Sequence, residues 1–343
     1  MTLRSFYILL LVTAIAVLGA AGIVYQRNAA AIGVLDSDPV FPGLTDRLND
    51  VTTITLASAE GRTTLTRKGE YWAVGESHDY PARSDSVRAL LLALADMKTM
   101  EAKTSRPEMF SRLEVEAQDS DKAKSTLIAL RDKSDAVLAE ILVGKRRFGR
   151  GGQADAHYVR RPDSTQALLA ESRLDARHQP IDWLDRRIAS IDRDQVRQVT
   201  ITHPDGESLS VGKDSAETND FVIRDLPEGV QIENQFQLNA TAGTLNQLVL
   251  DAVRPAEGLS FGTEGTRYET FDGLVVEVTF AEADGTTWTR YRASTTAEAS
   301  DDAKAKAAEI NMRTEGWAYA LTDFKIEQLR RRMADLVKPA GKS

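Results

Sequence analysis

The stretch ITLASAEGRTTLTRKGEYWAV, residues 54–74, sets the fold that we expect for this chain. It holds three short runs of β-branched and apolar residues, at positions 54–57, 64–66 and 71–74. The Glu60-Gly61 pair between the first two runs is typical of a turn. This pattern predicts a meander of three antiparallel strands.

A helix is predicted directly after this meander, because apolar residues recur there at the spacing of one helix face, behind Ser84 as a suitable N-cap. These residues are Val87, Leu90, Leu91, Leu94 and Met97. Further on, the pattern predicts a hairpin at 126–130 and 138–143, a strand at 158–160 and a helix at 164–171.

The same order of predicted elements then recurs. The second set comprises strands at 199–202, 209–211 and 221–223, a helix carrying Leu245, Leu248, Val249 and Ala252, a hairpin at 275–280 and 288–291, a strand at 317–320 and a helix at 323–336. We therefore expect an α+β fold of two similar units, each a mostly antiparallel sheet with helices on one face. Chance recurrence is the alternative, because meanders followed by helices are common.

An unbroken apolar run from Phe6 to Val24 precedes these units, and no charged residue lies between Arg4 and Arg27. About 20 apolar residues form a helix long enough to cross a bilayer. We expect an uncleaved transmembrane helix, because the apolar core of a cleaved signal peptide, which is the alternative, usually has only about 7 to 15 residues. The expected boundaries are 1–26 for the membrane anchor, 27–50 for a linker, 51–191 and 192–338 for the two α+β repeats, and 339–343 for a disordered tail.

The short N-terminal tail before a long polar body fits a tail that stays in the cytoplasm while the body is exported. We therefore expect a single-pass protein of the bacterial inner membrane, with its bulk in the periplasm. The chain has no Cys, which excludes disulfides and a lipid anchor on cysteine. Its 51 acidic and 43 basic side chains give a net charge of −8, which disfavours a nucleic-acid partner.

The densest basic segment is GKRRFGRGG, residues 144–152. Its four cations, Lys145, Arg146, Arg147 and Arg150, form a possible anion-binding loop for a phosphate or an anionic envelope polymer. The favoured alternative is a loop that follows a strand and is kept soluble by charge. It is not a P-loop, because no Ser or Thr follows the Lys.

No other motif predicts catalysis, a cofactor or a metal. The four His residues lack metal-ligand spacing, and the acidic pair in Asp192-Arg193-Asp194 is a weak cation site. Ser210 and Lys213 match an S-x-x-K spacing, but they fall in a predicted strand and turn and not on a helix. We therefore expect a protein that is not an enzyme.

Several short motifs resemble a bacterial family known only as domain of unknown function 4340. They are Phe41-Pro42-Gly43-Leu44, Tyr80-Pro81-Ala82, Leu142-Val143-Gly144-Lys145, Tyr158-Val159-Arg160 and Trp183-Leu184-Asp185, and the resemblance spans residues 41–191. Members of that family resemble this chain in carrying an N-terminal anchor, and their genes typically lie beside ABC-type systems similar to gliding-motility transporters. The resemblance therefore implies an extracytoplasmic accessory protein of such a complex. It supplies no catalytic residues.

These inferences favour a non-catalytic accessory protein of an ABC-transporter or gliding-type envelope complex. Its expected partners are the transporter's membrane subunit and, through the run from Phe6 to Val24, the lipid bilayer. An envelope glycan or lipid binding protein is the alternative. An envelope hydrolase ranks last.

The basic segment can be tested with a triple variant in which Arg146, Arg147 and Arg150 are all changed to Ala. We expect the variant to fold normally, because exposed charges contribute little to stability. Full complementation of a deletion strain by this variant would exclude the anion-binding role.

Overall fold

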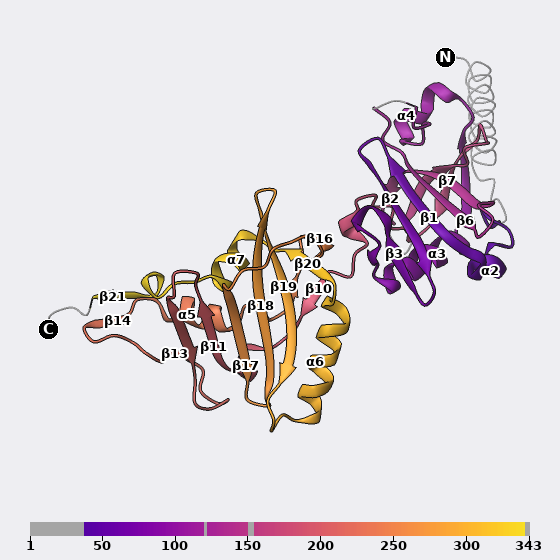
Figure 1. The fold of residues 1–343 in the computed structure, drawn as a ribbon. Coiled ribbons are helices and arrows are strands. Elements are labelled where there is room, and N and C mark those ends of the chain that lie inside the picture. Colours follow the sequence, from indigo (N-terminus) through magenta and orange to yellow (C-terminus); the bar gives the residue numbers. More distant parts are fainter. Residues whose placement is uncertain (1–37, 120–121, 150–153, 340–343) are drawn as a thin grey trace, which may run out of the picture. The chain divides into compact units, whose positions relative to one another are not determined.

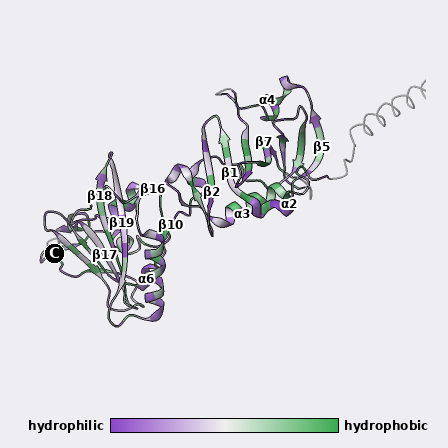
Figure 2. Ribbon diagram, turned by 45° about the vertical axis from the view of Figure 1, so that its right-hand side comes forward, coloured by the Kyte–Doolittle hydropathy of each residue, from purple (hydrophilic) through white to green (hydrophobic). Residues whose placement is uncertain are grey.

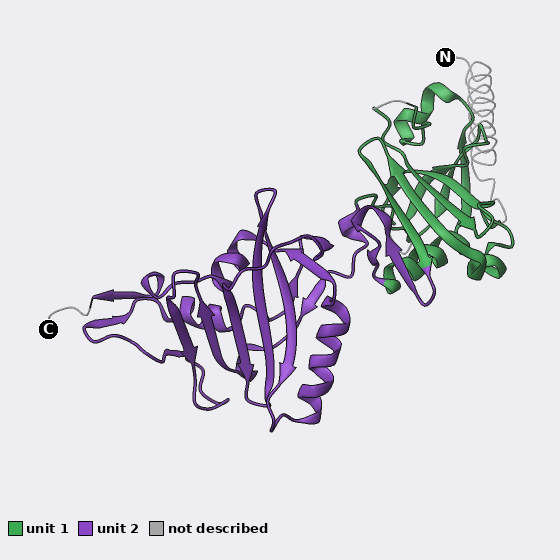
Figure 3. Ribbon diagram, viewed as in Figure 1, with its two compact units in different colours: residues 1–67, 84–179 green, residues 68–83, 180–343 purple. Residues whose placement is uncertain are grey.

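The computed structural model describes residues 38–119, 122–149 and 154–339. Two features from the sequence lie outside these residues, namely Arg150 and the apolar run from Phe6 to Val24. Within the described ranges, no helix is both long and apolar enough to cross a membrane. The chain divides into two compact units, Met1–Arg67 with Ser84–Gln179, and Lys68–Arg83 with Pro180–Ser343 (Figure 3).

A nine-stranded sheet dominates the first part of the chain (Figure 1). Its strand order is β4-β3-β2-β1-β6-β7-β8-β9-β5. The strands are β1 (Val51–Ser58), β2 (Gly61–Lys68), β3 (Tyr71–Val74), β4 (Tyr80–Pro81), β5 (Lys98–Thr104), β6 (Thr126–Asp132), β7 (Val137–Arg147), β8 (Ala156–Arg160) and β9 (Ala167–Glu171). These strands confirm the first predicted meander (β1–β3), the hairpin predicted at 126–130 and 138–143 (β6 and β7) and the strand predicted at 158–160 (β8).

Helix α3 (Ser84–Ala95) confirms the predicted helix and its apolar face from Val87 to Leu94, whereas Met97 lies beyond the end of the helix. Val87, Leu90 and Leu94 are all at most 1% exposed, as their helical spacing requires. Two one-turn helices accompany it in this unit, α2 (Leu44–Arg47) and α4 (Phe110–Leu113).

Residues 38–50, which we expected to belong to a linker, pack against the first unit. Val40, Phe41 and Leu44 are buried, and the Val40 N–H donates to the carbonyl of Met97 at 2.9 Å. The buried side chains of Val40, Phe41 and Leu44 therefore anchor this segment.

The helix expected at 164–171 is wrong, because residues 167–171 form strand β9 between β8 and β5. The sequence Ala167-Leu-Leu-Ala-Glu171 has high helix propensity. Two ladders of backbone hydrogen bonds outweigh that preference.

An eight-stranded sheet dominates the second unit, in the order β13-β12-β11-β17-β18-β19-β20-β16. Its strands are β11 (Val196–Thr202), β12 (Ser208–Gly212), β13 (Val222–Ile223), β16 (Ala252–Pro255), β17 (Gly265–Thr270), β18 (Leu274–Ala283), β19 (Thr286–Thr295) and β20 (Trp317–Ala320). Two small sheets pair β10 (Arg187–Ala189) with β15 (Leu248–Val249), and β14 (Val230–Ile232) with β21 (Val337–Pro339).

Along the strands of the eight-stranded sheet, apolar and polar residues alternate, so one face is apolar and the other is polar (Figure 2). Tyr268 and Val276 are fully buried, whereas their strand neighbours Arg267 and Glu277 form an ion pair at 2.9 Å with exposed side chains. This period of two is the sign of a half-buried antiparallel strand. The helices of this unit are α5 (Gln235–Ala242), α6 (Asp301–Thr314), which lies beside β19 (Figure 1), and α7 (Asp323–Leu329).

The second predicted helix is misplaced by the sequence pattern. Helix α5 begins after Asn234, whose side chain accepts from the N–H groups of Phe236 and Gln237, and it ends at Ala242. The apolar residues Leu248 and Val249 instead form β15. The predicted last helix is confirmed only over α7, because residues 333–335 form a separate 3-10 turn.

The two large sheets share one strand order. In each, a three-strand meander is followed by a helix and then by a strand at the far edge, β5 or β16. The next strand, β6 or β17, returns to pair with the first strand of the meander. By sheet position, β6 and β7 therefore correspond to β17 and β18, not to the hairpin at 275–291 that the sequence pattern suggested.

Gly144 is the position in the first sheet where the backbone comes closest to another segment. A Cβ atom there would overlap the carbonyl oxygen of Leu113 and lie 2.6 Å from that of Glu114. The β7–β8 register also shifts between Val143 and Arg146. Only glycine therefore fits between the strand and the end of α4.

Changing Gly144 to Ala should lower the free energy of unfolding by about 1–3 kcal/mol, because the added methyl group forces the strand or α4 to move. Chemical denaturation measures this change. Gly61→Ala is the matched control, since no atom lies within 4 Å of the new Cβ, and an equal loss in both variants would contradict the explanation.

Candidate functional site

The first four residues of the basic segment, 144–147, belong to strand β7, so this part of the segment is not a free loop. Arg146 forms an ion pair with Asp155, and its guanidinium lies 4.6 Å from the ring centre of Phe148. The Gly149 N–H and Arg146 hold the pKa of Asp155 below its usual value. Arg146 therefore already has a carboxylate partner.

Lys145 is also engaged, since its Nζ donates to the carbonyl of Arg112 at 3.0 Å and lies 3.8 Å from Glu114. Arg147 shows no ion pair among the described residues, and Arg150 lies outside them. Two of the three described cations thus face acidic side chains, which reduces the positive field available to an anion.

One His meets a carboxylate in the second unit, but away from solvent. His203 Nδ1 lies 3.6 Å from Glu264, and their side chains are only 2% and 10% exposed. Arg330 donates twice to Glu264, at 2.8 and 2.9 Å, and once to Glu282 at 3.0 Å. This cluster joins the segment after α7 to the sheet, with the His203 and Glu264 side chains buried.

The other motifs considered in the sequence also have structural partners. Asp192 and Gln195 form a reciprocal capping box around the 3-10 turn η5 (Arg193–Gln195). Buried Lys213 donates to the carbonyls of Ala216 and Thr218 at 3.2 and 3.0 Å. Among the residues that the structure describes, no three His, Asp or Glu side chains cluster as a metal site would require.

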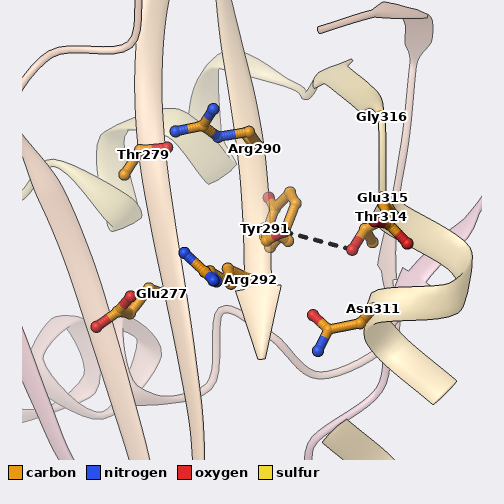
Figure 4. A pocket seen from close by; sticks show the side chains of 9 residues that line it. All are labelled: Glu277, Thr279, Arg290, Tyr291, Arg292, Asn311, Thr314, Glu315 and Gly316. Atoms are coloured by element: carbon orange, nitrogen blue, oxygen red, sulfur yellow. Dashed lines mark hydrogen bonds between the residues drawn. The ribbon is translucent and has the colours of Figure 1, made fainter. Parts of the chain in front are cut away.

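A first hollow, of about 540 Å³, lies between the polar face of the second sheet and the end of α6 (Figure 4). The side chains of Arg290 and Arg292 extend from β19 over β18, where Glu277 stands opposite Arg292. Thr314 donates to the Tyr291 carbonyl at 3.4 Å and ties the helix to the strand. Cations and carboxylates alternate here, as on a solvated sheet face.

A second hollow, of about 580 Å³, lies between η5, α5 and α7, and we call it the α5–α7 hollow. It differs from the first in having two exposed aromatic side chains at its edges. Phe236 on α5 is 77% exposed and Phe324 on α7 is 59% exposed. The residues that line the hollow are Asp192, Arg193, Asp194, Gln195, Phe236, Asn239, Ala240, Gly243, Asn246, Phe324, Lys325 and Gln328.

The α5–α7 hollow contains hydrogen-bond donors that the protein leaves unused. Lys325 is half-buried, and burial lowers the pKa of its ammonium group with no carboxylate to offset that effect. Its Nζ donates to the carbonyl of Thr244 at 2.9 Å, and it has no ion pair in the described part of the chain. Gln328 is 4% exposed, and its Oε1 accepts from Thr244 at 3.3 Å, while its Nε2 has no described partner.

This combination favours binding over catalysis. Exposed aromatic side chains are enriched where proteins meet other molecules, and donors without a protein partner can bind acceptors of a ligand. Sequence reasoning missed this site, because its residues come from three segments that only the fold brings together. The available signal was the Asn234 cap, since it places Phe236 in the exposed first turn of α5.

Comparison with known proteins gives one match. The model of a family described as "Domain of unknown function (DUF4340)" matches residues 72–264, which is more than half of the chain. The match starts within β3 and ends directly before β17, so it continues past residue 191, where the resemblance suggested by the sequence motifs ends. No curated protein and no solved structure matches the chain.

His157 gives the first unit a predicted sensitivity to acid. Burial and the nearby Arg146 lower its pKa from the ordinary 6.5, so the unfolded chain binds a proton more readily than the folded one. The free energy of unfolding should therefore fall as the pH drops below about 6.5, by at most about 1.4 kcal/mol per pH unit.

Denaturation at a series of pH values tests this sensitivity. His157→Phe should flatten the acid loss, whereas Tyr158→Phe in the same strand should keep it. An unchanged pH profile in His157→Phe would contradict the assignment to this side chain.

Proposed function

This chain belongs to the DUF4340 family, and from that premise we propose that it is a non-catalytic accessory protein of an ABC-transporter or gliding-type envelope complex. The apolar run from Phe6 to Val24 would hold it in the bacterial inner membrane as a single-pass protein. The bulk of the chain would lie in the periplasm and contact a membrane subunit of the transporter.

The observation that carries this proposal is the pair of exposed phenyl groups, Phe236 and Phe324, at the edges of the α5–α7 hollow. Apolar surface of this kind is better explained by a partner than by solvent. The buried, fully bonded setting of His203 and Glu264 gives less support to a hydrolase. The paired cations of the basic segment give less support to an envelope-polymer binder.

We also propose that the two large sheets descend from an internal duplication. The support is their common order of eight strands, from the meander to the far-edge strand β5 or β16. A helix, α3 or α5, stands at the same place in both orders.

Affinity purification of the full chain from detergent-solubilised membranes tests the accessory role. We expect a membrane subunit of an ABC-type transporter to copurify in stoichiometric amount. The control replaces residues 1–26 with a cleavable export signal, and it should be recovered in the soluble periplasmic fraction. If no transporter subunit is recovered with the full chain, the proposal fails.

A further inference from the structure

The α5–α7 hollow has a donor-rich floor. The ammonium group of Lys325 donates one hydrogen bond, to Thr244, and therefore keeps two N–H groups for other acceptors. The Gln328 Nε2 also has no partner among the described residues. Donors outnumber acceptors at this point, so the best complement is a negatively charged acceptor.

A carboxylate fits this floor best. It accepts several hydrogen bonds at once, and charge-assisted bonds from an ammonium group are about twice as strong as neutral ones. The partial burial of Lys325 reduces screening by water, which strengthens its attraction to a carboxylate. The carboxylates of the lining do not fill this role, since Asp192 accepts in the η5 capping box and Asp194 lies 3.7 Å from Arg193.

The rim of the hollow favours apolar groups. Phe236 and Phe324 stand on different helices, and more than half of the surface of each residue is exposed. An apolar side chain placed between them would remove three apolar surfaces from water at once. A ligand with a carboxylate next to an apolar group could therefore bind the donors of the floor and the phenyl rings of the rim at the same time.

We infer that the α5–α7 hollow binds a short segment of the partner protein in which an Asp or Glu side chain adjoins a large apolar side chain. The inference rests on the proposed function for the existence of a partner, and it names the chemistry that this partner presents. The carboxylate meets Lys325 and Gln328, while the apolar side chain lies between Phe236 and Phe324.

A random heptapeptide library displayed on phage tests this inference with the full chain held in detergent micelles. The expected result is enrichment of peptides that carry Asp or Glu next to Leu, Ile, Phe, Met or Trp. These peptides should not bind the Phe236→Ala/Phe324→Ala double variant. Phe148→Ala, which removes a 67% exposed phenyl group from the other unit, is the matched control and should keep binding.

A double-mutant cycle then tests the contact with Lys325. An enriched peptide should bind at least about tenfold more weakly when its acidic residue becomes Asn or Gln. Lys325→Met, which keeps the aliphatic stem, should cause a similar loss, and in that variant the peptide change should have no further effect. Additive losses would place the carboxylate elsewhere and overturn the inference.

The remaining outcomes are equally decisive. Failure to enrich any peptide, enrichment of peptides without an acidic residue, or binding that survives the double variant would each overturn the inference. Binding of an envelope saccharide at the same Phe residues, with no peptide selected, would also overturn it. Copurification of the transporter subunit with the double variant would leave the proposed function standing and reject only this site.

Discussion

The first strand of each meander, β1 or β11, determines the register of its sheet, because it pairs with a neighbouring strand on both sides. Ile54 in β1 faces Leu65 across one ladder and Leu130 across the other. Val199 in β11 likewise faces Val211 and Tyr268. All six side chains are fully buried, so a slip of one residue would turn an apolar row towards water.

Much of this fold follows from local sequence, and the exceptions have physical causes. The meanders, α3 and the β18–β19 hairpin were predicted, because their apolar periodicity survives in the folded chain. Strand β9 was missed, because pairing on both edges overrides its helix propensity. Strand β17 and helix α6 escaped prediction, since the first buries mainly Thr266, Tyr268 and Thr270, and the second buries small side chains.

The candidate site was less predictable than the fold. Composition drew attention to the basic segment, but a sequence does not reveal that Asp155 lies against Arg146. The α5–α7 hollow depends on residues 136 positions apart, Asp192 and Gln328, and no local pattern joins them. The two sites differ in how their cations are paired. Arg146 forms an ion pair with Asp155, whereas Lys325 is half-buried and has no carboxylate partner in the described part of the chain.

The contact between Arg330 and Glu264 also bears on how the protein is made. Glu264 is 8% exposed and receives both of its charged hydrogen bonds from a residue close to the C-terminus. A buried carboxylate that lacks its cationic partner strongly destabilises a fold. A nascent chain that does not yet extend past Arg330 would therefore contain an unpaired Glu264 carboxylate, and its second sheet would be less stable. Arg330, which directly follows α7, thus links the stability of the second sheet to a late step of synthesis.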